Sequence, residues 1–396
     1  MLQSFLKAVR RERWTVGSTA LAAGIGVIAW HGIPALIVLS AIVPTVIFRQ
    51  WTRTRAFIVA FAYYAAASWP MIPGVLGYFG SSGTLARAVI FWVLPSLLLP
   101  LPWVVLRPRE LRAALWRLPL AYLITVVAPF GIIGWASPLT AAGIAFPGWG
   151  WFGLTAFLAL SSLACIAPVR ATVLAVGLAL FANAIYPGDP PPPDSWEGVR
   201  TTFELAANAL DPMPEFQAAQ DVQQIARTSA KHVIVFPEFV VPRWTQASDG
   251  FWRHSLNGAK ANDKTLLIGA GLPVQGTRRY RNAVLTMGAE AAPPFFERIP
   301  VPVVMWNPFN SADSVPLEMF GPGILRVRGE RAAVLVCYEQ LLTWPIFHSA
   351  LQHPTLIVGV ANDHWARGTT IGAAQQAAVT AWARLFRLPR VLAVNQ

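Results

Sequence analysis

Ala332-Ala333-Val334-Leu335-Val336 is a run of five apolar residues that leads directly into Cys337-Tyr338-Glu339. An apolar run of this length is typical of a buried strand, and a thiol at its end lies at a strand-to-helix turn. The other of the two cysteines, Cys165, lies in a long apolar segment far upstream, so we expect no disulfide between them. A cysteine beside a carboxylate is a candidate nucleophile, although an isolated cysteine is more often a small buried core residue.

The composition divides the chain into two parts. Of its 396 residues, 55% are hydrophobic and 13% are charged, where about 25% charged is usual for a soluble domain. Most residues before Tyr186 are apolar and nearly all acidic residues follow it, which predicts a membrane domain over residues 1–186. The net charge of +12 lies largely in clusters between apolar segments. Because the chain has no nucleic-acid-binding motif, we expect no nucleic acid contact.

Seven apolar segments precede residue 187, and about 20 apolar residues are needed to cross a bilayer. They are Val16–Trp30, Pro34–Phe48, Ala56–Phe79, Leu85–Leu106, Leu118–Ala136, Trp149–Ala167 and Ala171–Tyr186. The first two are short and form either a helical hairpin or one re-entrant unit. Basic residues gather in every second connection, which places the N-terminus in the cytoplasm. Seven spans then predict a multi-pass protein of the bacterial inner membrane whose C-terminal domain is periplasmic.

A proline-rich linker over residues 187–196 leads to a region in which strand and helix patterns alternate. We expect strands over Gly198–Phe203, His232–Phe236, Thr265–Leu272, Asn282–Met287, Ile324–Arg328, Ala332–Val336, Thr355–Val360 and Arg390–Val394. We expect helices over Glu215–Ser229, Ala247–Ala261, Leu342–Leu351 and Thr370–Phe386. This alternation predicts an α/β domain over residues 197–396, with sheets covered by helices.

Three of these strands end in unusual polar residues. Pro237-Glu238 follows one strand, Cys337-Tyr338-Glu339 a second and Asn362-Asp363-His364-Trp365 a third. Functional residues in such sheets gather at strand ends. From the residues alone we expect Cys337 to be the nucleophile and Glu238 the base that takes its proton, with His364 as an alternative base. There is no paired Cys/His spacing and no nucleotide-binding loop, so we expect no metal and no cofactor.

Taken in order, Phe236-Pro237-Glu238, Cys337-Tyr338-Glu339 and Asn362–Trp365 with Gln375 or Gln376 resemble the motifs of the carbon–nitrogen hydrolase (nitrilase) superfamily. Seven apolar segments ahead of them make the chain similar to apolipoprotein N-acyltransferase. The short form, with Arg298-Ile299-Pro300-Val301-Pro302, most resembles the TraB proteins of conjugative plasmids. The resemblance implies an α-β-β-α sandwich and a Glu–Lys–Cys triad whose lysine stabilises the oxyanion.

Carried over by motif, the resemblance implies Glu238 as base and Cys337 as nucleophile. It also implies supporting roles for Tyr338, Glu339, Asn362 and Asp363. At the position of the family lysine the chain has Arg298, which is not a conservative exchange because arginine is a planar fork that stays protonated. We expect Arg298 to offer its positive charge to the oxyanion.

The chain ends one residue after Asn395, whereas the family continues with further strands. We therefore expect a C-terminally trimmed sandwich. The edge of its sheet is covered either by the chain's own loops or by a docked partner protein.

Two functions stay open at this point. The first is a membrane-embedded acyltransferase-like enzyme in which Cys337 takes an acyl group from a membrane phospholipid and passes it to a protein or peptide acceptor. The second is a catalytically degenerate structural component of a conjugation or pilus assembly apparatus. A membrane-bound amidase is a third, weaker alternative, because a soluble amidase would not need seven spans.

Overall fold

The computed structural model describes residues 2–203, 213–277 and 279–396. The chain forms two compact units. Unit 1 comprises Met1–Gly188, Leu341–Trp344 and Gly368–Arg387, and unit 2 comprises Asp189–Gln340, Pro345–Arg367 and Leu388–Gln396. Each unit is described by itself below.

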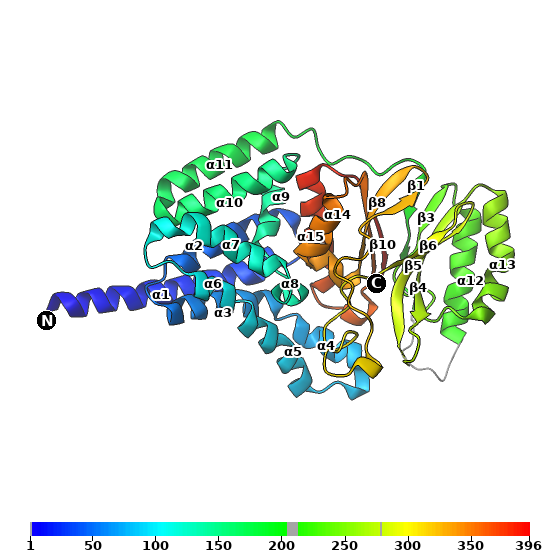
Figure 1. The fold of residues 1–396 in the computed structure, drawn as a ribbon, viewed down its shortest axis with the longest axis horizontal. Coiled ribbons are helices and arrows are strands. Elements are labelled where there is room, and N and C mark those ends of the chain that lie inside the picture. Colours follow the sequence, from blue (N-terminus) through cyan, green and yellow to red (C-terminus); the bar gives the residue numbers. More distant parts are fainter. Residues whose placement is uncertain (1, 204–212, 278) are drawn as a thin grey trace. The chain divides into compact units, whose positions relative to one another are not determined.

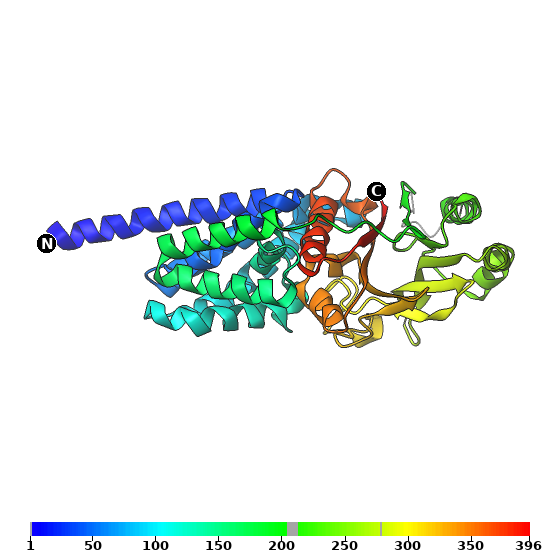
Figure 2. The ribbon, with the colours of Figure 1, turned by 90° about the horizontal axis from the view of Figure 1, so that it is seen from above.

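Unit 1 is built from helices, most of them short (Figure 1, Figure 2). Its α-helices are α1 (Leu2–Ala29), α2 (Val43–Phe48), α3 (Arg53–Ser68), α4 (Met71–Phe79), α5 (Leu85–Leu98), α6 (Leu101–Leu106), α7 (Ala114–Val126), α8 (Phe130–Ile133), α9 (Ala141–Ala145), α10 (Gly150–Ile166), α11 (Pro168–Ala184) and α15 (Ile371–Phe386). Short 3₁₀ helices join several of them, namely η1 (Pro34–Ile42), η2 (Gly80–Ser82), η3 (Leu111–Ala113) and η4 (Pro138–Thr140).

One helical segment of unit 1, Leu85–Leu106 with 22 residues, is long and apolar enough to cross a membrane. Two bent pairs also qualify if each is counted as one span: Arg53–Ser68 with Met71–Ser82, bent by 44°, and Pro138–Ala145 with Gly150–Ile166, bent by 119°. The described residues therefore provide one spanning helix, or up to three. Helices cover all seven predicted segments, but breaks such as the one at Pro70 shorten them. The seven-span topology stays a prediction.

Helix α15 packs inside unit 1 although it comes near the end of the chain. A Cβ atom on Gly143 of α9 would lie 1.9 Å from the carbonyl oxygen of Ala381, so only glycine permits this approach. Buried alanines along α15, among them Ala374, Ala377 and Ala378, keep that helix narrow. Small residues on both elements thus hold α15 at backbone distance from α9.

Unit 2 contains two five-stranded sheets. The first has the order β1 (Trp196–Gly198), β3 (Val233–Val235), β4 (Thr265–Pro273), β5 (Tyr280–Gly288) and β6 (Ala292–Phe296). The second has the order β2 (Arg200–Thr201), β10 (Arg390–Asn395), β9 (Leu356–Asn362), β8 (Glu330–Val336) and β7 (Leu325–Val327). Strands β1, β3 and β4 run parallel, as do β2, β10, β9 and β8, whereas β5, β6 and β7 pair antiparallel with their neighbours.

The two sheets pack face to face, and helices cover the outer face of the first sheet (Figure 1). Because side chains alternate along a strand, Val233 and Val235 enter the core between the sheets, which also contains Val334 of β8. Ile234 points the other way, into a core formed with α12 (Met213–Thr228) and α13 (Gln246–Ala261). A further helix, α14 (Thr343–Ala350), follows the second sheet's β8. The α/β character predicted for this region is confirmed.

Strand β10 is not the open edge of its sheet. Its last residues, Val394 and Asn395, pair in parallel with Arg200 and Thr201 of β2, and β9 lies on its other side. Of the two alternatives for this edge, a segment of the chain itself therefore covers β10. Strand β6 was not expected from the sequence, because its Pro293 and Pro294 are unfavourable in strands except at an edge, which is where β6 lies.

Candidate active site

Glu238 lies just beyond the end of β3, buried against β4. Glu238 is only 6% exposed. The chain can pass this close to β4 because residue 269 is glycine: a Cβ atom there would lie 2.1 Å from the carbonyl oxygen of Pro237. Gly269 therefore positions the turn that carries Glu238.

Cys337 lies at the end of β8, where the chain turns into the 3₁₀ helix η6 (Cys337–Leu341). Its φ angle is 45°, in the left-handed region that non-glycine residues rarely adopt. Strained backbone of this kind is concentrated at functional sites. The Cys337 thiol forms a hydrogen bond with the carboxylate of Glu238. The structure thus brings together the two residues expected to be nucleophile and base.

A second carboxylate, Glu297, joins this site through Asn282 of β5. The Asn282 Nδ2 atom donates to Oε1 of Glu238 at 2.7 Å and to Oε2 of Glu297 at 3.0 Å. Glu297 is fully buried, and its Oε1 atom has no hydrogen-bond partner among the described residues. Neither Asn282 nor Glu297 was expected at this site from the sequence.

Asn362 and Asp363, at the end of β9, complete the site. The backbone N–H of Asn362 donates to Oε2 of Glu238 at 2.9 Å. The Asn362 side-chain oxygen accepts from Nδ2 of Asn395 at 3.0 Å, and Asn395 accepts from the Thr201 hydroxyl at 2.7 Å. His364, the alternative base, is half-buried, and its backbone N–H donates to the Asn362 side chain at 3.4 Å. Of the two candidate bases, Glu238 is the one that forms a hydrogen bond with the thiol.

Arg298 has a different environment from the one expected. All five of its N–H groups donate to protein acceptors: two to Glu339, and one each to the Val334 carbonyl, the Pro345 carbonyl and the Ser349 hydroxyl. Arg298 is 1% exposed and Glu339 is fully buried. The sequence predicted that Arg298 contacts an oxyanion. Because all five of its N–H groups already have acceptors, none is left to donate to an oxyanion. Its neighbour in sequence, Glu297, faces the Glu238 cluster instead.

Glu339 holds the turn around the thiol in shape. Besides pairing with Arg298, its Oε1 accepts the backbone N–H groups of Arg298 at 2.9 Å and Ile299 at 3.2 Å, and its Oε2 accepts that of Val336 at 3.1 Å. These bonds tie the residue before Cys337 to the segment after β6. Tyr338, next to Cys337, is half-buried, and burial raises the pKa of its phenol.

The electrostatics of the site favour protonated groups. Burial raises the pKa of the Cys337 thiol well above its usual value, and the carboxylates of Glu238 and Glu297 raise it further. Burial also raises the pKa of Glu297 well above its usual value, as does the charge of Glu238. The pKa of Glu238 is raised by burial, against its hydrogen bonds from Cys337, Asn362 and Asn282. Burial and the charge of Glu238 raise the pKa of Asp363 to about 7.

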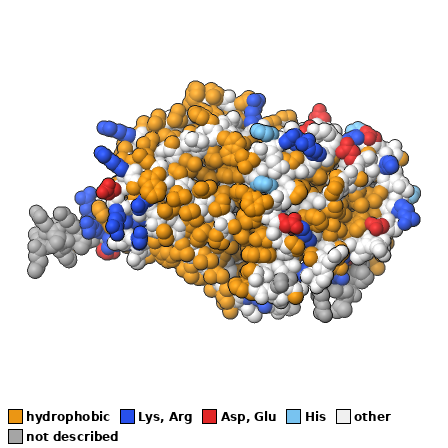
Figure 3. Space-filling view, in the orientation of Figure 1, with side chains coloured by type: hydrophobic (Ala, Val, Ile, Leu, Met, Phe, Trp, Pro, Cys, Tyr) orange, Lys and Arg blue, Asp and Glu red, His pale blue; other side chains and the backbone are white. Residues whose placement is uncertain are grey.

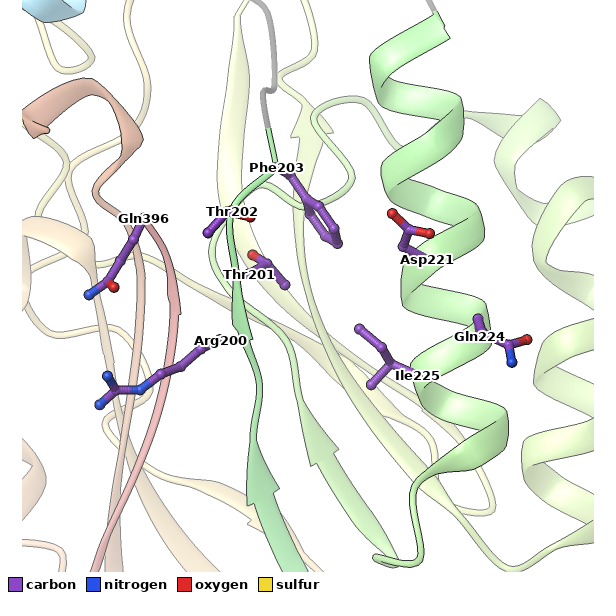
Figure 4. A pocket seen from close by; sticks show the side chains of 8 residues that line it. All are labelled: Arg200, Thr201, Thr202, Phe203, Asp221, Gln224, Ile225 and Gln396. Atoms are coloured by element: carbon purple, nitrogen blue, oxygen red, sulfur yellow. The ribbon is translucent and has the colours of Figure 1, made fainter.

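A separate pocket of unit 2 lies between β2 and α12 (Figure 4). It has a volume of about 380 Å³, and Phe203 and Ile225 point into it beside polar side chains. None of the predicted site residues lines it. Among the described residues, no group of three or more His, Cys, Asp or Glu side chains has an arrangement that could hold a metal ion.

Two curated relatives match nearly the whole chain. A conjugal transfer protein TraB of Agrobacterium fabrum is 32% identical over 97% of this chain and 94% of its own length. A probable conjugal transfer protein TraB of Sinorhizobium fredii is 32% identical over 94% of this chain and 95% of its own length. An apolipoprotein N-acyltransferase of Azotobacter vinelandii is 26% identical over 38% of this chain and 32% of its own length.

No family model matches the sequence. The matches to solved structures are weaker than those to the curated relatives. A Glu-to-Gln variant of the amidase from Nesterenkonia sp. AN1 aligns with a TM-score of 0.28 at 16% identity, over 42% of this chain and 65% of the amidase chain. A Cys-to-Ala variant of that amidase aligns with a TM-score of 0.30. These scores are too low to identify a shared fold. The full-length matches confirm the predicted resemblance, and the chain belongs to the family of TraB conjugal transfer proteins.

Proposed function

We propose that this protein is a membrane-bound, nitrilase-like acyltransferase of conjugal transfer, in which Cys337 carries the acyl group as a thioester. The observation that carries the proposal is the hydrogen bond between the Cys337 thiol and the buried Glu238 carboxylate. A nucleophile within hydrogen-bond reach of its base, in a backbone conformation that holds it at a strand end, is the arrangement that covalent acyl transfer needs.

In the first step, Cys337 Sγ attacks an ester carbonyl of the donor while its proton moves to Glu238. The carbonyl oxygen becomes an oxyanion, and the ester C–O bond then breaks. The leaving alcohol takes the proton from Glu238, and a thioester remains. In the second step an acceptor amine attacks the thioester and gives its proton to Glu238. The C–S bond then breaks, and the leaving Cys337 Sγ takes that proton, which restores both the thiol and the Glu238 carboxylate. Water as the acceptor would give the amidase-like or hydrolytic outcome.

Glu297 takes the place of the lysine in this proposal. Its Oε2 atom accepts from Asn282, so the proton of the neutral acid resides on the unpartnered Oε1. A buried carboxylic acid that stays neutral at pH 7 is able to donate a hydrogen bond to an oxyanion. The backbone N–H of Tyr338 is the second donor, as expected for the residue after a nucleophile. This arrangement needs no positive charge from Arg298.

The acyl donor in this proposal is a membrane phospholipid, and the acceptor is a protein or peptide. The exposed apolar surface of unit 1 supports contact with lipid (Figure 3). We further propose the topology expected from the sequence, a multi-pass protein of the inner membrane with a cytoplasmic N-terminus and a periplasmic unit 2. The alternating basic connections support it.

The test is transfer from phospholipid carrying a labelled acyl chain to a primary-amine acceptor by the purified full chain. Wild type and Cys165→Ala should transfer the label, and Cys337→Ala should not. Cys165→Ala is the matched control because it removes the other buried thiol. Equal transfer by Cys337→Ala and wild type would refute a thioester route, and release of free fatty acid alone would favour the hydrolytic alternative.

Two observations favour a second candidate function, in which the protein is a structural component of the conjugation apparatus. The carboxylates around Cys337 disfavour its thiolate, and Arg298 is committed to Glu339. If the protein is a structural component, a Cys337→Ala strain would conjugate as well as wild type. If it is an acyltransferase, the same strain would give fewer transconjugants. Counting transconjugants in matched strains separates the two.

A further inference from the structure

Unit 1 contains a cavity of about 910 Å³ that the proposed acyl-transfer chemistry does not use. Three segments far apart in sequence converge on it: the N-terminal half of α1, the connection from α2 to α3 and the connection from α6 to α7. These segments contribute six arginines, which are Arg10, Arg11, Arg13, Arg49, Arg107 and Arg109. Figure 3 shows Lys and Arg side chains gathered at the end of unit 1 where the chain begins.

The arginines of the cavity outnumber the acidic residues of the segments that line it, which are Glu12 of α1 and Glu110 between Arg109 and Leu111. No acidic side chain is among its lining residues. The nearby acid of α1, Glu12, pairs with Arg55, which does not line the cavity. Among the described residues, none of the six arginines forms an ion pair. Guanidinium groups that line one cavity repel one another, and an anion bound among them would relieve that repulsion.

Two of the arginines are fixed at the cavity by backbone carbonyls. Arg49 donates from Nη1 to the Cys165 carbonyl at 2.8 Å, and Arg107 donates from Nε to the Gln50 carbonyl at 2.6 Å. A third, Arg11, stacks over the ring of Trp51 with its guanidinium carbon 4.6 Å from the ring centroid. These contacts orient the guanidinium groups and leave most of their N–H donors for a ligand. If these arginines served only to set the membrane topology, they would need neither to line one cavity nor to have fixed orientations.

We propose that this cavity binds the phosphate headgroup of an anionic phospholipid. Arginine forks match phosphate oxygens in geometry and charge. The cavity is far larger than an inorganic phosphate, and Trp14 and Trp51 line it beside the arginines. Tryptophan is enriched where membrane meets water, and basic pockets between helices bind lipid headgroups. The large hydrophobic surface that adjoins the basic end of unit 1 in Figure 3 suits the acyl chains of the same lipid.

The test is native mass spectrometry of the purified full chain in detergent, titrated with phosphatidylglycerol or with phosphatidylcholine. The variant is Arg10→Gln/Arg13→Gln/Arg109→Gln, which leaves the fixed Arg49 and Arg107 in place. Arg170→Gln is the control, because Arg170 is an exposed arginine of unit 1 outside the cavity. A basic side chain near a lipid surface strengthens binding about fivefold, so we expect the triple variant to bind phosphatidylglycerol about a hundredfold more weakly.

Support requires that wild type and Arg170→Gln prefer phosphatidylglycerol to phosphatidylcholine and that the triple variant, with an unchanged melting temperature, loses that preference. Equal binding of both lipids by wild type, or no effect of the triple substitution, would overturn the proposal. Inorganic phosphate that displaces the lipid at equal concentration would make the site one for free phosphate. A single-stranded oligonucleotide that outcompetes the lipid would assign it to nucleic acid. Both of these results also contradict the proposal.

Discussion

Arg298→Met separates a structural role of this arginine from the catalytic role that the sequence suggested. The substitution removes five N–H donors from a residue that is 1% exposed and leaves the fully buried Glu339 without its charged partner. Breaking a buried ion pair on one side costs about 3–5 kcal/mol. In a folding unit of roughly 200 residues that loss lowers the melting temperature by roughly 6–20 °C.

The assay is thermal unfolding of the full chain in detergent, followed by tryptophan fluorescence. Arg326→Met is the control, since Arg326 is an exposed arginine of the same unit, on strand β7. The double variant Arg298→Met/Glu339→Gln should recover part of the loss, because it no longer buries an unpaired charge while keeping an acceptor for the backbone N–H groups. A melting temperature of Arg298→Met equal to that of Arg326→Met, combined with loss of acyl transfer, would refute the structural assignment and return Arg298 to catalysis.

Three further predictions concern the site itself. Glu297→Leu should lower acyl transfer about 10²–10³-fold through loss of an oxyanion donor, while Glu297→Lys should retain it; a Glu297→Leu rate equal to that of wild type would exclude Glu297 from the reaction. Burial raises the pKa of Asp363 from 3.8 to about 7, so the folded state binds the extra proton and stability should fall as pH rises from about 4 to 7; Asp363→Asn should flatten this slope in melting curves, and an unchanged slope would contradict it. Gly269→Ala, whose Cβ would lie 2.1 Å from the Pro237 carbonyl oxygen, should destabilise unit 2 by about 1–3 kcal/mol, with the exposed Gly250→Ala as control; equal melting temperatures would contradict the close approach.

Strand ends were the most informative feature of the sequence. Short apolar runs ending at Glu238, Cys337 and Asn362 predicted where polar residues would gather, because functional residues in such sheets lie at strand ends. The strands belong to different sheets, since β3 lies in the first sheet and β8 and β9 lie in the second. The structure joins all three through hydrogen bonds to Glu238. In this respect local pattern and fold agree.

The third member of the site could not be assigned from the motif, because neighbouring residues of an extended chain face opposite ways. Arg298 was the only cationic residue near the expected lysine, and a shift of one position exchanges it for Glu297. The residue that contacts the cluster through Asn282 is Glu297, and Arg298 points into the pair with Glu339. Because Glu297 and Arg298 follow the end of β6 at Phe296, strand alternation along β6 does not decide which of the two faces the cluster.

Long-range polar contacts were outside what the sequence could show. Asn282, Asn395 and Thr201 lie on three different strands, and each has the appearance of an ordinary strand polar residue until the sheets are assembled. The same holds for the pairing of β2 with β10, which joins residues about 190 positions apart. The grouping of α15 with the helices of unit 1 likewise depends on packing at Gly143 and not on its place in the chain.

Acylation of Cys337 can be measured by intact-mass spectrometry of the full chain after incubation with native phospholipid, followed by digestion to locate any adduct. We expect a mass increase of one fatty acyl chain, removed by hydroxylamine, on the peptide that contains Cys337, in wild type and Cys165→Ala but not in Cys337→Ala. An unmodified Cys337 peptide in wild type, in a preparation whose mass spectra show phospholipid bound to the protein, would contradict the thioester and leave the structural role in conjugation.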